Sequence, residues 1–267
     1  MSLHPLTVSL AQMDCRLGEP EANEARAAAF IAEAARRGSH LLLLPELWRS
    51  GYDLANAARY VAPLGTGPFA WLAQQARAHG LWIASSLLEA REGEIFNTAT
   101  LFSPEGELAA VYRKVHLFGL MDEDRYLAAG DAAPVFDLPW GRSALAICYD
   151  LRFPELFRRY ALEGAVLIML PAQWPRRRAE AFRALVRARA AENQCFLLAC
   201  NRVGKSGDTP FGGRSAVVDP WGNVIVEGGE TELLLTAEIE MGQVAEAREH
   251  IPVFRDRRPD VYGVGSW

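Results

Sequence analysis

The order in which strand and helix patterns follow one another restricts the fold of this chain most. In the first half, a strand, an Ala-rich helix, a second strand and a second helix precede three closely spaced strands. The second half repeats this plan without a residue-level repeat, and no linker separates the halves. We therefore predict one α/β domain over residues 1–267. The predicted segments are 6–11, 21–37, 40–44, 68–80, 81–88, 95–102 and 107–115, then 144–148, 154–163, 165–171, 178–193, 195–203, 214–219, 224–227 and 233–239.

Size and charge narrow the class of protein. Half of the 267 residues are apolar, so a large core can form without disulfides or metal. The net charge of −5 argues against a nucleic-acid-binding surface. One basic run, within residues 175–189, coincides with an amphipathic helix pattern, and we interpret it as a solvated face.

The cysteines and the N-terminus predict a soluble cytoplasmic protein. Cys15, Cys148, Cys195 and Cys200 lack paired metal-ligand spacing and indicate reduced thiols. The first residues show no basic leader followed by an apolar segment. The longest apolar runs are much too short to cross a bilayer, so no membrane role is expected.

Cys148 stands where a short buried strand breaks sharply into a helix that carries Pro154 and Glu155 in its first turn. Backbone N–H groups of such a turn and the positive end of the helix would favour the thiolate. Cys148 is therefore a candidate nucleophile. The alternative is a small core residue, since free cysteines are among the most buried side chains, and this local pattern leaves both interpretations open.

Two further candidates follow predicted strands. Glu46 comes directly after the apolar strand 40–44, at the edge where open α/β sheets place their chemistry, although a solvated loop carboxylate is the alternative. Lys114 ends the third strand of the first half and shares a face with His116 by the two-residue period. Glu46 and Lys114 can meet only if these strand ends are neighbours. We predict that residues 119–131 form a loop that covers a site.

Three motifs in this order, LLLLPELWRSGY, YRKVHLF and ICYDLRFPEL, resemble those of the nitrilase superfamily of carbon–nitrogen hydrolases. The resemblance extends to ARAAENQCF, VVDPWG and the tail IPVFRDRRPDVYG, and so covers nearly the whole chain. It implies a four-layer αββα sandwich and a catalytic triad of Glu46, Lys114 and Cys148. Glu123, counted back from Gly130, is the best match for the auxiliary glutamate of the family.

These residue types suit amide hydrolysis. Glu46 would take the proton of Cys148, whose sulfur adds to the amide carbon. Lys114 and a backbone N–H such as that of Tyr149 would stabilise the oxyanion, and Glu46 would then return the proton to the leaving ammonia. Water hydrolyses the resulting thioester. The scheme requires no metal or cofactor, and His116 is expected to be a structural hydrogen-bonding residue.

Within the family, the chain is most similar to the omega-amidase and deaminated-glutathione amidase branch, and omega-amidase is the favoured reading. Its substrates, monoamides of small dicarboxylates, require a cation for the distal carboxylate. The candidate substrate-binding residues are Arg176, Arg152, Arg202, Trp174 and Phe118.

Three alternatives remain open: a deaminated-glutathione amidase, a nitrile hydrolase and a non-catalytic scaffold that binds a partner. The resemblance also implies a homodimer. The irregular tail, about residues 250–267, is expected to pack on the body or on a partner subunit.

Overall fold

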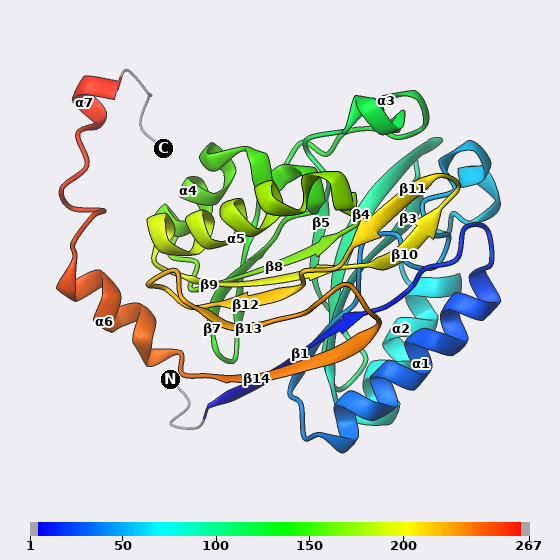
Figure 1. Ribbon diagram of the computed structural model, residues 1–267, viewed down its shortest axis with the longest axis horizontal. Coiled ribbons are helices and arrows are strands. Elements are labelled where there is room, and N and C mark those ends of the chain that lie inside the picture. The colour runs from blue at the N-terminus through cyan, green and yellow to red at the C-terminus, as the bar shows by residue number, and fades with distance from the viewer. Residues whose placement is uncertain (1–4, 263–267) are drawn as a thin grey trace.

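A computed structural model describes residues 5–262 and shows two six-stranded sheets packed face to face between two layers of helices (Figure 1). This arrangement confirms the predicted four-layer αββα sandwich. The first sheet has the order β14 (Leu233–Ile239), β1 (Leu6–Gln12), β2 (Leu41–Leu43), β3 (Trp82–Arg91), β4 (Glu94–Phe102) and β5 (Leu108–Arg113). The second has the order β13 (Val224–Glu227), β12 (Ala216–Val218), β9 (Phe196–Asn201), β8 (Leu167–Ala172), β7 (Gly141–Leu145) and β6 (Val135–Leu138).

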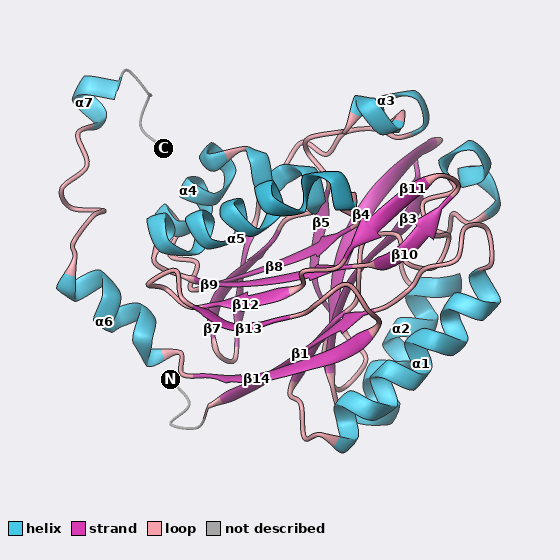
Figure 2. Cartoon of the chain, in the orientation of Figure 1, coloured by secondary structure: helices cyan, strands magenta, loops and turns pink. Residues whose placement is uncertain are grey.

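Each sheet has a pair of helices on its outer face. Helices α1 (Pro20–Arg36) and α2 (Gly67–His79) cover the first sheet, and α4 (Pro154–Leu162) and α5 (Ala179–Asn193) cover the second (Figure 2). Helix α1 begins with proline and buries a stripe of alanine and isoleucine side chains at helical spacing. Helix α2 ends at Gly80, which has a φ of 63° and so takes the left-handed conformation that stops a helix.

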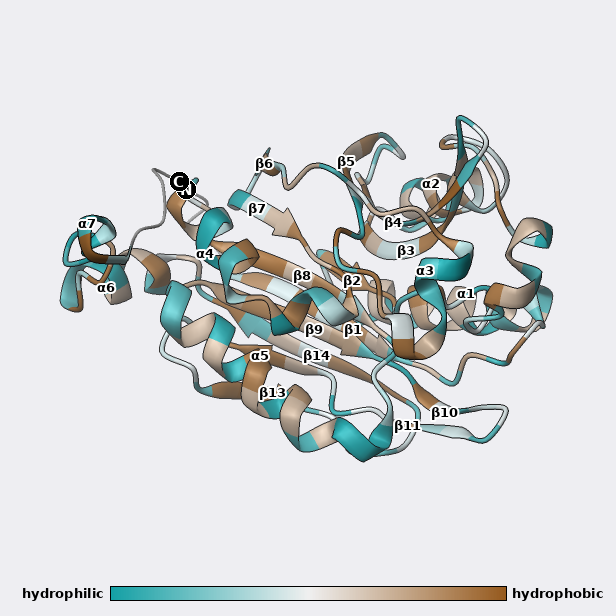
Figure 3. Ribbon diagram, turned by 90° about the horizontal axis from the view of Figure 1, so that it is seen from above, coloured by the Kyte–Doolittle hydropathy of each residue, from teal (hydrophilic) through white to brown (hydrophobic). Residues whose placement is uncertain are grey.

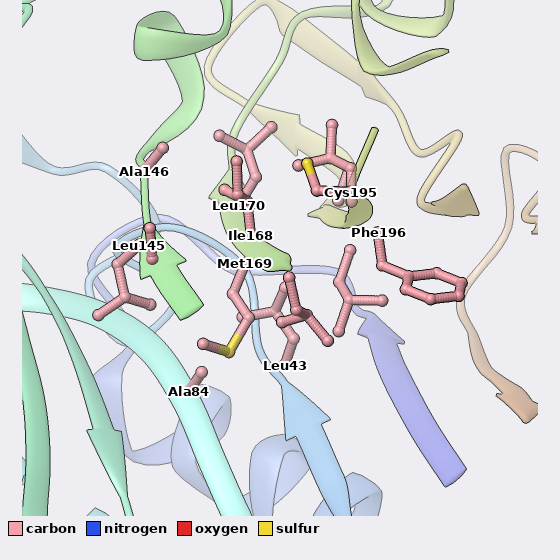
Figure 4. Close-up of a cluster of buried hydrophobic side chains, with 14 of the residues drawn as sticks. Leu43, Ala84, Leu145, Ala146, Ile168, Met169, Leu170, Cys195 and Phe196 are labelled. Atoms are coloured by element: carbon pink, nitrogen blue, oxygen red, sulfur yellow. The ribbon is translucent and has the colours of Figure 1, made fainter. Parts of the chain in front are cut away.

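The main core lies between the sheets. Apolar strands occupy the middle of the molecule and more polar segments the outer helices (Figure 3). Leu43 and Ala84 of the first sheet pack with Leu145, Ile168 and Met169 of the second in one buried cluster (Figure 4). Burial on both faces explains why the strands read as continuous apolar runs rather than as alternating ones.

The second half was expected to end, like the first, in three neighbouring strands, and this prediction is wrong because its last strand belongs to the other sheet. Only β12 and β13 pair as a hairpin, whereas β14 crosses to the first sheet and pairs antiparallel with β1 from Leu6↔Ile239 to Gln12↔Leu233. This pairing covers the edge of β1, where unpaired backbone groups would otherwise remain. Strand β6 and the hairpin of β10 (Val203–Ser206) and β11 (Thr209–Gly212) were not predicted.

Strand direction decides where the polar residues can meet. Strand β2 is parallel to β3, and two antiparallel steps through β4 make β5 parallel to β2, so the carboxyl ends of β2 and β5 share one edge. In the second sheet β7, β8 and β9 are parallel. The segments after these strands therefore gather at one end of the sandwich, where open α/β sheets bind their ligands.

The end of the chain leaves the body after β14. Helices α6 (Gly242–His250) and α7 (Pro259–Tyr262) extend to one side of the sandwich (Figure 1). Phe254 packs under the guanidinium groups of Arg158 and Arg248, but Val261 is 65% and Tyr262 58% exposed. The tail thus contacts the body at Phe254 and at Ile251, whose carbonyl oxygen accepts from Gln194 Nε2 at 2.8 Å, and residues 263–267 lie outside the described part. Across residues 5–262, every helix is too short or too polar to cross a membrane.

Candidate active site

Three buried charged side chains from distant segments meet at the shared edge. The Nζ atom of Lys114 lies 2.8 Å from Glu46 Oε1 and 2.6 Å from Glu123 Oε1. All three side chains are fully removed from solvent. Glu46 is therefore not a solvated loop carboxylate, and the predicted strand ends do converge.

The backbone around Lys114 brings Glu123 back to it. Lys114 follows β5, donates its N–H to Asn97 O and accepts from the N–H of Gly130 at 2.8 Å. A Cβ atom at Gly130 would lie 2.3 Å from the carbonyl oxygen of Arg113, so only glycine allows this approach. The loop is thereby held against β5, with Glu123 facing the ammonium.

Glu46 is held by groups from both sheets. Its Oε1 also accepts from Asn97 Nδ2 at 2.8 Å, and its Oε2 accepts from the backbone N–H of Gln173 at 2.9 Å. The Gln173 side chain donates to the Glu46 carbonyl at 2.6 Å. The sequence analysis missed Asn97 and Gln173, although Gln173 directly follows the apolar strand β8, the same signal that identified Glu46.

Glu123 opens the short helix α3 (Glu123–Tyr126) inside the segment predicted as a loop. Its Oε2 accepts from the N–H of Phe118 at 2.6 Å, and its Oε1 accepts from Tyr52 Oη at 2.5 Å. Tyr52 was also missed. Its φ of 75° is uncommon for a residue other than glycine, and it turns the phenol toward the charged side chains.

Cys148 begins a short 3₁₀ turn, η3 (Cys148–Arg152), three residues after β7 ends. Its φ of 44° lies in the left-handed region, which costs a non-glycine residue roughly 1–2 kcal/mol. Strain of this kind tends to gather at functional sites. The side chain is 7% exposed and lines a pocket, so Cys148 is not an ordinary core cysteine.

Asp150 holds the turn that carries Cys148. Its Oδ2 accepts from the N–H of Ile147 at 2.8 Å and from Tyr112 Oη at 2.7 Å. Its Oδ1 lies 3.2 Å from the His116 backbone N and 2.8 Å from His116 Nδ1. The His116 ring stacks on Phe153 at 3.6 Å. The structure thus confirms His116 as a structural hydrogen-bonding residue.

The buried charges shift one another's pKa values. Burial raises the pKa of the Cys148 thiol well above its usual value, and Glu46 raises it further, against the opposing effect of Lys114. Burial and the Glu123 charge also raise the pKa of Glu46, although Lys114 opposes them. Burial alone would lower the pKa of Lys114, but Glu123 and Glu46 outweigh it and raise that pKa. The turn was expected to favour the thiolate, but burial and the Glu46 charge oppose ionisation of Cys148 here, which leaves the removal of its proton to a base such as Glu46.

A small pocket lies at Cys148. It contains the predicted Arg152, Trp174, Phe118 and Tyr149. The complete lining consists of Tyr52, Phe118, Met121, Cys148, Tyr149, Arg152, Gln173, Trp174, Pro175 and Arg178.

Two of the predicted arginines lie elsewhere. Arg176 is exposed, pairs with Glu230 at 2.9 Å and lines a separate groove. Arg202 is buried, and its guanidinium lies 3.2 Å from Asp14 and 2.7 Å from the Ser206 hydroxyl. Because internal partners hold both guanidinium groups, neither residue supports the predicted role in binding a substrate carboxylate.

The remaining cysteines differ from Cys148. All four cysteines are free, but Cys15, Cys195 and Cys200 are completely buried and line no part of the pocket. Burial raises the pKa of both Cys15 and Cys195 to about 12. Within residues 5–262, no three His, Cys, Asp or Glu side chains are grouped so as to hold a metal ion.

Proteins of similar sequence include amidases. The chain is 42% identical over 257 residues to the 2-oxoglutaramate amidase of Bacillus subtilis (strain 168), a match that covers 96% of this chain and 99% of the relative. It is 35% identical over 253 residues to an omega-amidase of Homo sapiens, with 91% of each chain covered.

Solved structures share the fold of this chain, and a family model matches residues 7–249. A CN-hydrolase superfamily protein from Xanthomonas campestris, with an arsenic adduct in its active site, superimposes with a TM-score of 0.90 at 33% identity, covering 96% of this chain and 98% of that one. A mutant amidase from Nesterenkonia sp. AN1, with the acetamide moiety of fluoroacetamide added covalently at the active-site cysteine, gives 0.82 at 28% identity, covering 96% and 99%. Residues 7–249 match the carbon-nitrogen hydrolase family, and the chain therefore belongs to that family.

Proposed function

We propose that this protein is a cysteine-dependent omega-amidase that hydrolyses the terminal amide of a small dicarboxylate monoamide to the acid and ammonia. The observation that carries the proposal is the ammonium of Lys114 between Glu46 and Glu123, beside the pocket-lining thiol of Cys148. The 2-oxoglutaramate amidase and omega-amidase names of the relatives support this choice of substrate.

The first step forms a bond between Cys148 Sγ and the amide carbon. Glu46 accepts the thiol proton as the sulfur adds, because a thiol with a raised pKa does not ionise in advance. The carbonyl electrons move to oxygen. Lys114 has three N–H donors and uses two on carboxylates, so the third can stabilise this oxyanion together with the Tyr149 N–H.

The second step breaks the carbon–nitrogen bond. Glu46 returns its proton to the amide nitrogen, the oxyanion collapses, and ammonia leaves a thioester on Cys148. Water then attacks the thioester carbon while Glu46 accepts a proton from it. The sulfur leaves and is reprotonated, and the product is the free acid. The balance is one amide and one water for one acid and one ammonia.

Glu123 acts in this scheme as a positioning residue. It fixes Lys114 and is itself fixed by Tyr52 and by the N–H of Phe118. Burial raises the pKa of Glu46, and the negative charge of Glu123 nearby raises it further. A carboxylate with a raised pKa holds a proton more readily than an ordinary glutamate, which suits a group that must accept a proton and return it.

Ammonia release tests the proposal. The substrates are 2-oxoglutaramate, succinamate, glutamine, deaminated glutathione and a nitrile of one of the same acids, and we expect the first two to be the best. Preference for deaminated glutathione or for the nitrile would favour those alternative activities. If no compound is hydrolysed, and iodoacetamide labels Cys148 no faster than the buried Cys15, the scaffold interpretation replaces the amidase.

We also propose that the protein is a cytoplasmic homodimer of single-domain subunits. Four free cysteines suit a reducing compartment. The exposed Val261 and Tyr262 at the end of the described tail offer apolar surface to a second subunit. Sedimentation at micromolar concentration tests the dimer, and a monomer at all concentrations contradicts it. Cell fractionation tests the location.

A further inference from the structure

Two guanidinium groups in the pocket at Cys148 lack a carboxylate partner among the residues that the structure describes. Arg152 and Arg178 both line this pocket, and neither forms an ion pair with any residue in the range 5–262. Other arginines near this end of the sandwich are neutralised, as shown by Arg176 with Glu230 and Arg202 with Asp14. The pocket wall therefore carries positive charge that no carboxylate of the described part of the chain compensates.

Aromatic rings hold both groups in place. The guanidinium carbon of Arg152 lies 4.8 Å from the centroid of the Trp174 ring, and that of Arg178 lies 5.3 Å from the Phe118 ring. The indole N–H of Trp174 donates to the backbone carbonyl of Arg178 at 2.9 Å, which ties the two supports together. Contact with a ring face uses none of the N–H donors of a guanidinium, so those donors remain for a ligand.

Arg178 is less well satisfied by hydrogen bonds and solvent than Arg152. Its Nη1 atom is buried and forms no hydrogen bond with the described residues, whereas the Arg152 side chain reaches solvent. A buried charged donor without an acceptor is unfavourable. Burial and the like charges of Arg177 and Arg152 lower the pKa of Arg178. An anion between Arg152 and Arg178 would relieve both effects.

The chemistry of the anion follows from the shape of the donors and from the size of the pocket. Guanidinium groups match planar carboxylates with paired hydrogen bonds. The same small pocket contains the Cys148 thiol, so a ligand held by Arg178 cannot lie far from the nucleophile.

We propose that Arg178, with Arg152 beside it, binds the second carboxylate of the substrate and thereby selects short amides that carry an acid group. This inference rests on the proposed amidase function and adds the residue that determines its specificity. Arg178 does not touch the reacting bond.

A pair of substrates and a pair of variants test the inference. Succinamate carries the second carboxylate, and butanamide replaces it with a methyl group. In Arg178→Met we expect kcat/KM for succinamate to fall on the order of 100-fold, mainly through KM, because a charge-assisted pair is lost. We expect kcat/KM for butanamide to stay within about threefold, since that substrate makes no such pair.

Arg177→Met is the matched control. Arg177 is the adjacent, exposed arginine and lines the outer groove rather than the pocket at Cys148. The same loss of charge there should leave both substrates unchanged. Arg178→Lys should recover only part of the succinamate activity, because an ammonium lacks the planar fork of donors.

Calorimetry separates failure of this inference from failure of the amidase proposal. Succinamate is titrated into Cys148→Ala, with and without Arg178→Met, and the second change should weaken binding by a similar factor. Equal losses of kcat/KM for succinamate and butanamide in Arg178→Met would overturn the role of Arg178. So would a titration in which Arg178→Met does not weaken the binding of succinamate, or in which no binding of succinamate is detected. Absence of turnover with intact, Arg178-dependent binding would overturn the amidase proposal alone.

Discussion

Two buried polar clusters flank Cys148, and they differ in how completely their hydrogen bonds are used. The lysine cluster consists of Glu46, Lys114, Glu123 and Tyr52, and the Asp150 cluster consists of Asp150, Tyr112 and His116. Each oxygen of Asp150 has two donors within 3.2 Å, so its capacity is filled. Lys114 uses only two of its three donors on protein carboxylates.

The difference separates a structural site from a reactive one. A saturated carboxylate fixes a backbone turn and has nothing left for a ligand. A lysine with a free donor, two carboxylates and a neighbouring thiol retains capacity for a reacting group. Changes in the lysine cluster should therefore affect catalysis most, and changes in the Asp150 cluster should affect mainly stability.

Replacing the nucleophile should have the largest effect. In Cys148→Ala we expect kcat/KM for succinamate to fall by at least about 10⁴-fold, because no thioester can form. Steady-state ammonia release measures this loss. Cys195→Ala, a change at a buried cysteine outside the pocket, is the control and should retain activity. Turnover by Cys148→Ala above about 1% of the wild-type rate would mean that another group is the nucleophile.

Removing the ammonium group of Lys114 should have the second-largest effect on activity. Lys114→Met should lower kcat by about 10³-fold, since one oxyanion donor is lost and Glu46 is misplaced. It should also lower the free energy of unfolding by about 3–5 kcal/mol, because two buried carboxylates lose their cation. Chemical denaturation and ammonia release measure the two effects.

Lys205→Met provides the matched control for Lys114→Met, because Lys205 is exposed and its ammonium forms no ion pair among residues 5–262. It should change neither quantity. Full activity in Lys114→Met would exclude the lysine cluster as the reactive site.

Neutralising the Glu123 carboxylate should reduce activity less than these changes and should shift the pH dependence of catalysis. Glu123→Gln should reduce kcat by roughly 10²-fold, within the range expected for a group that supports acid–base catalysis. The Glu123 charge raises the pKa of Glu46, so its removal should lower that pKa. The acid limb of the kcat/KM profile reports the base that must be deprotonated and should move to lower pH. A limb that stays in place, or moves upward, would show that Glu46 does not titrate on it.

Changing the Asp150 cluster should affect activity least. Asp150→Asn supplies one acceptor oxygen to donors that filled two, so we expect about 1–3 kcal/mol lower stability. The reduction in kcat should be about tenfold or less, and the acid limb should not move, since Asp150 faces the turn and not Glu46. Chemical denaturation and the pH dependence of kcat/KM, measured side by side for Asp150→Asn and Glu123→Gln, compare the two variants. A larger kcat loss in Asp150→Asn than in Glu123→Gln would reverse the assignment of the two clusters.

Much of the site could be predicted because strand ends are visible in a sequence. Glu46 and Cys148 each follow an apolar strand, and the same signal could have found Gln173. Tyr52 and Asn97 carry no comparable signal, because their roles depend on contacts with residues 71 and 51 positions away. Arg178 was missed in favour of Arg176 because both lie on one tight turn and line one groove, and the sequence does not show that only Arg178 also reaches the pocket at Cys148.

Apolar periodicity and turn residues along the chain determined the order of helices and strands, and the resemblance of three local motifs to a known family implied the sandwich and the three motif residues. Only the tertiary structure decided that β14 joins the first sheet, that burial raises the pKa of the Cys148 thiol and that Arg178 lines the pocket. These outcomes depend on burial and on distances between segments far apart in the chain, which set desolvation and charge interactions that no local pattern records.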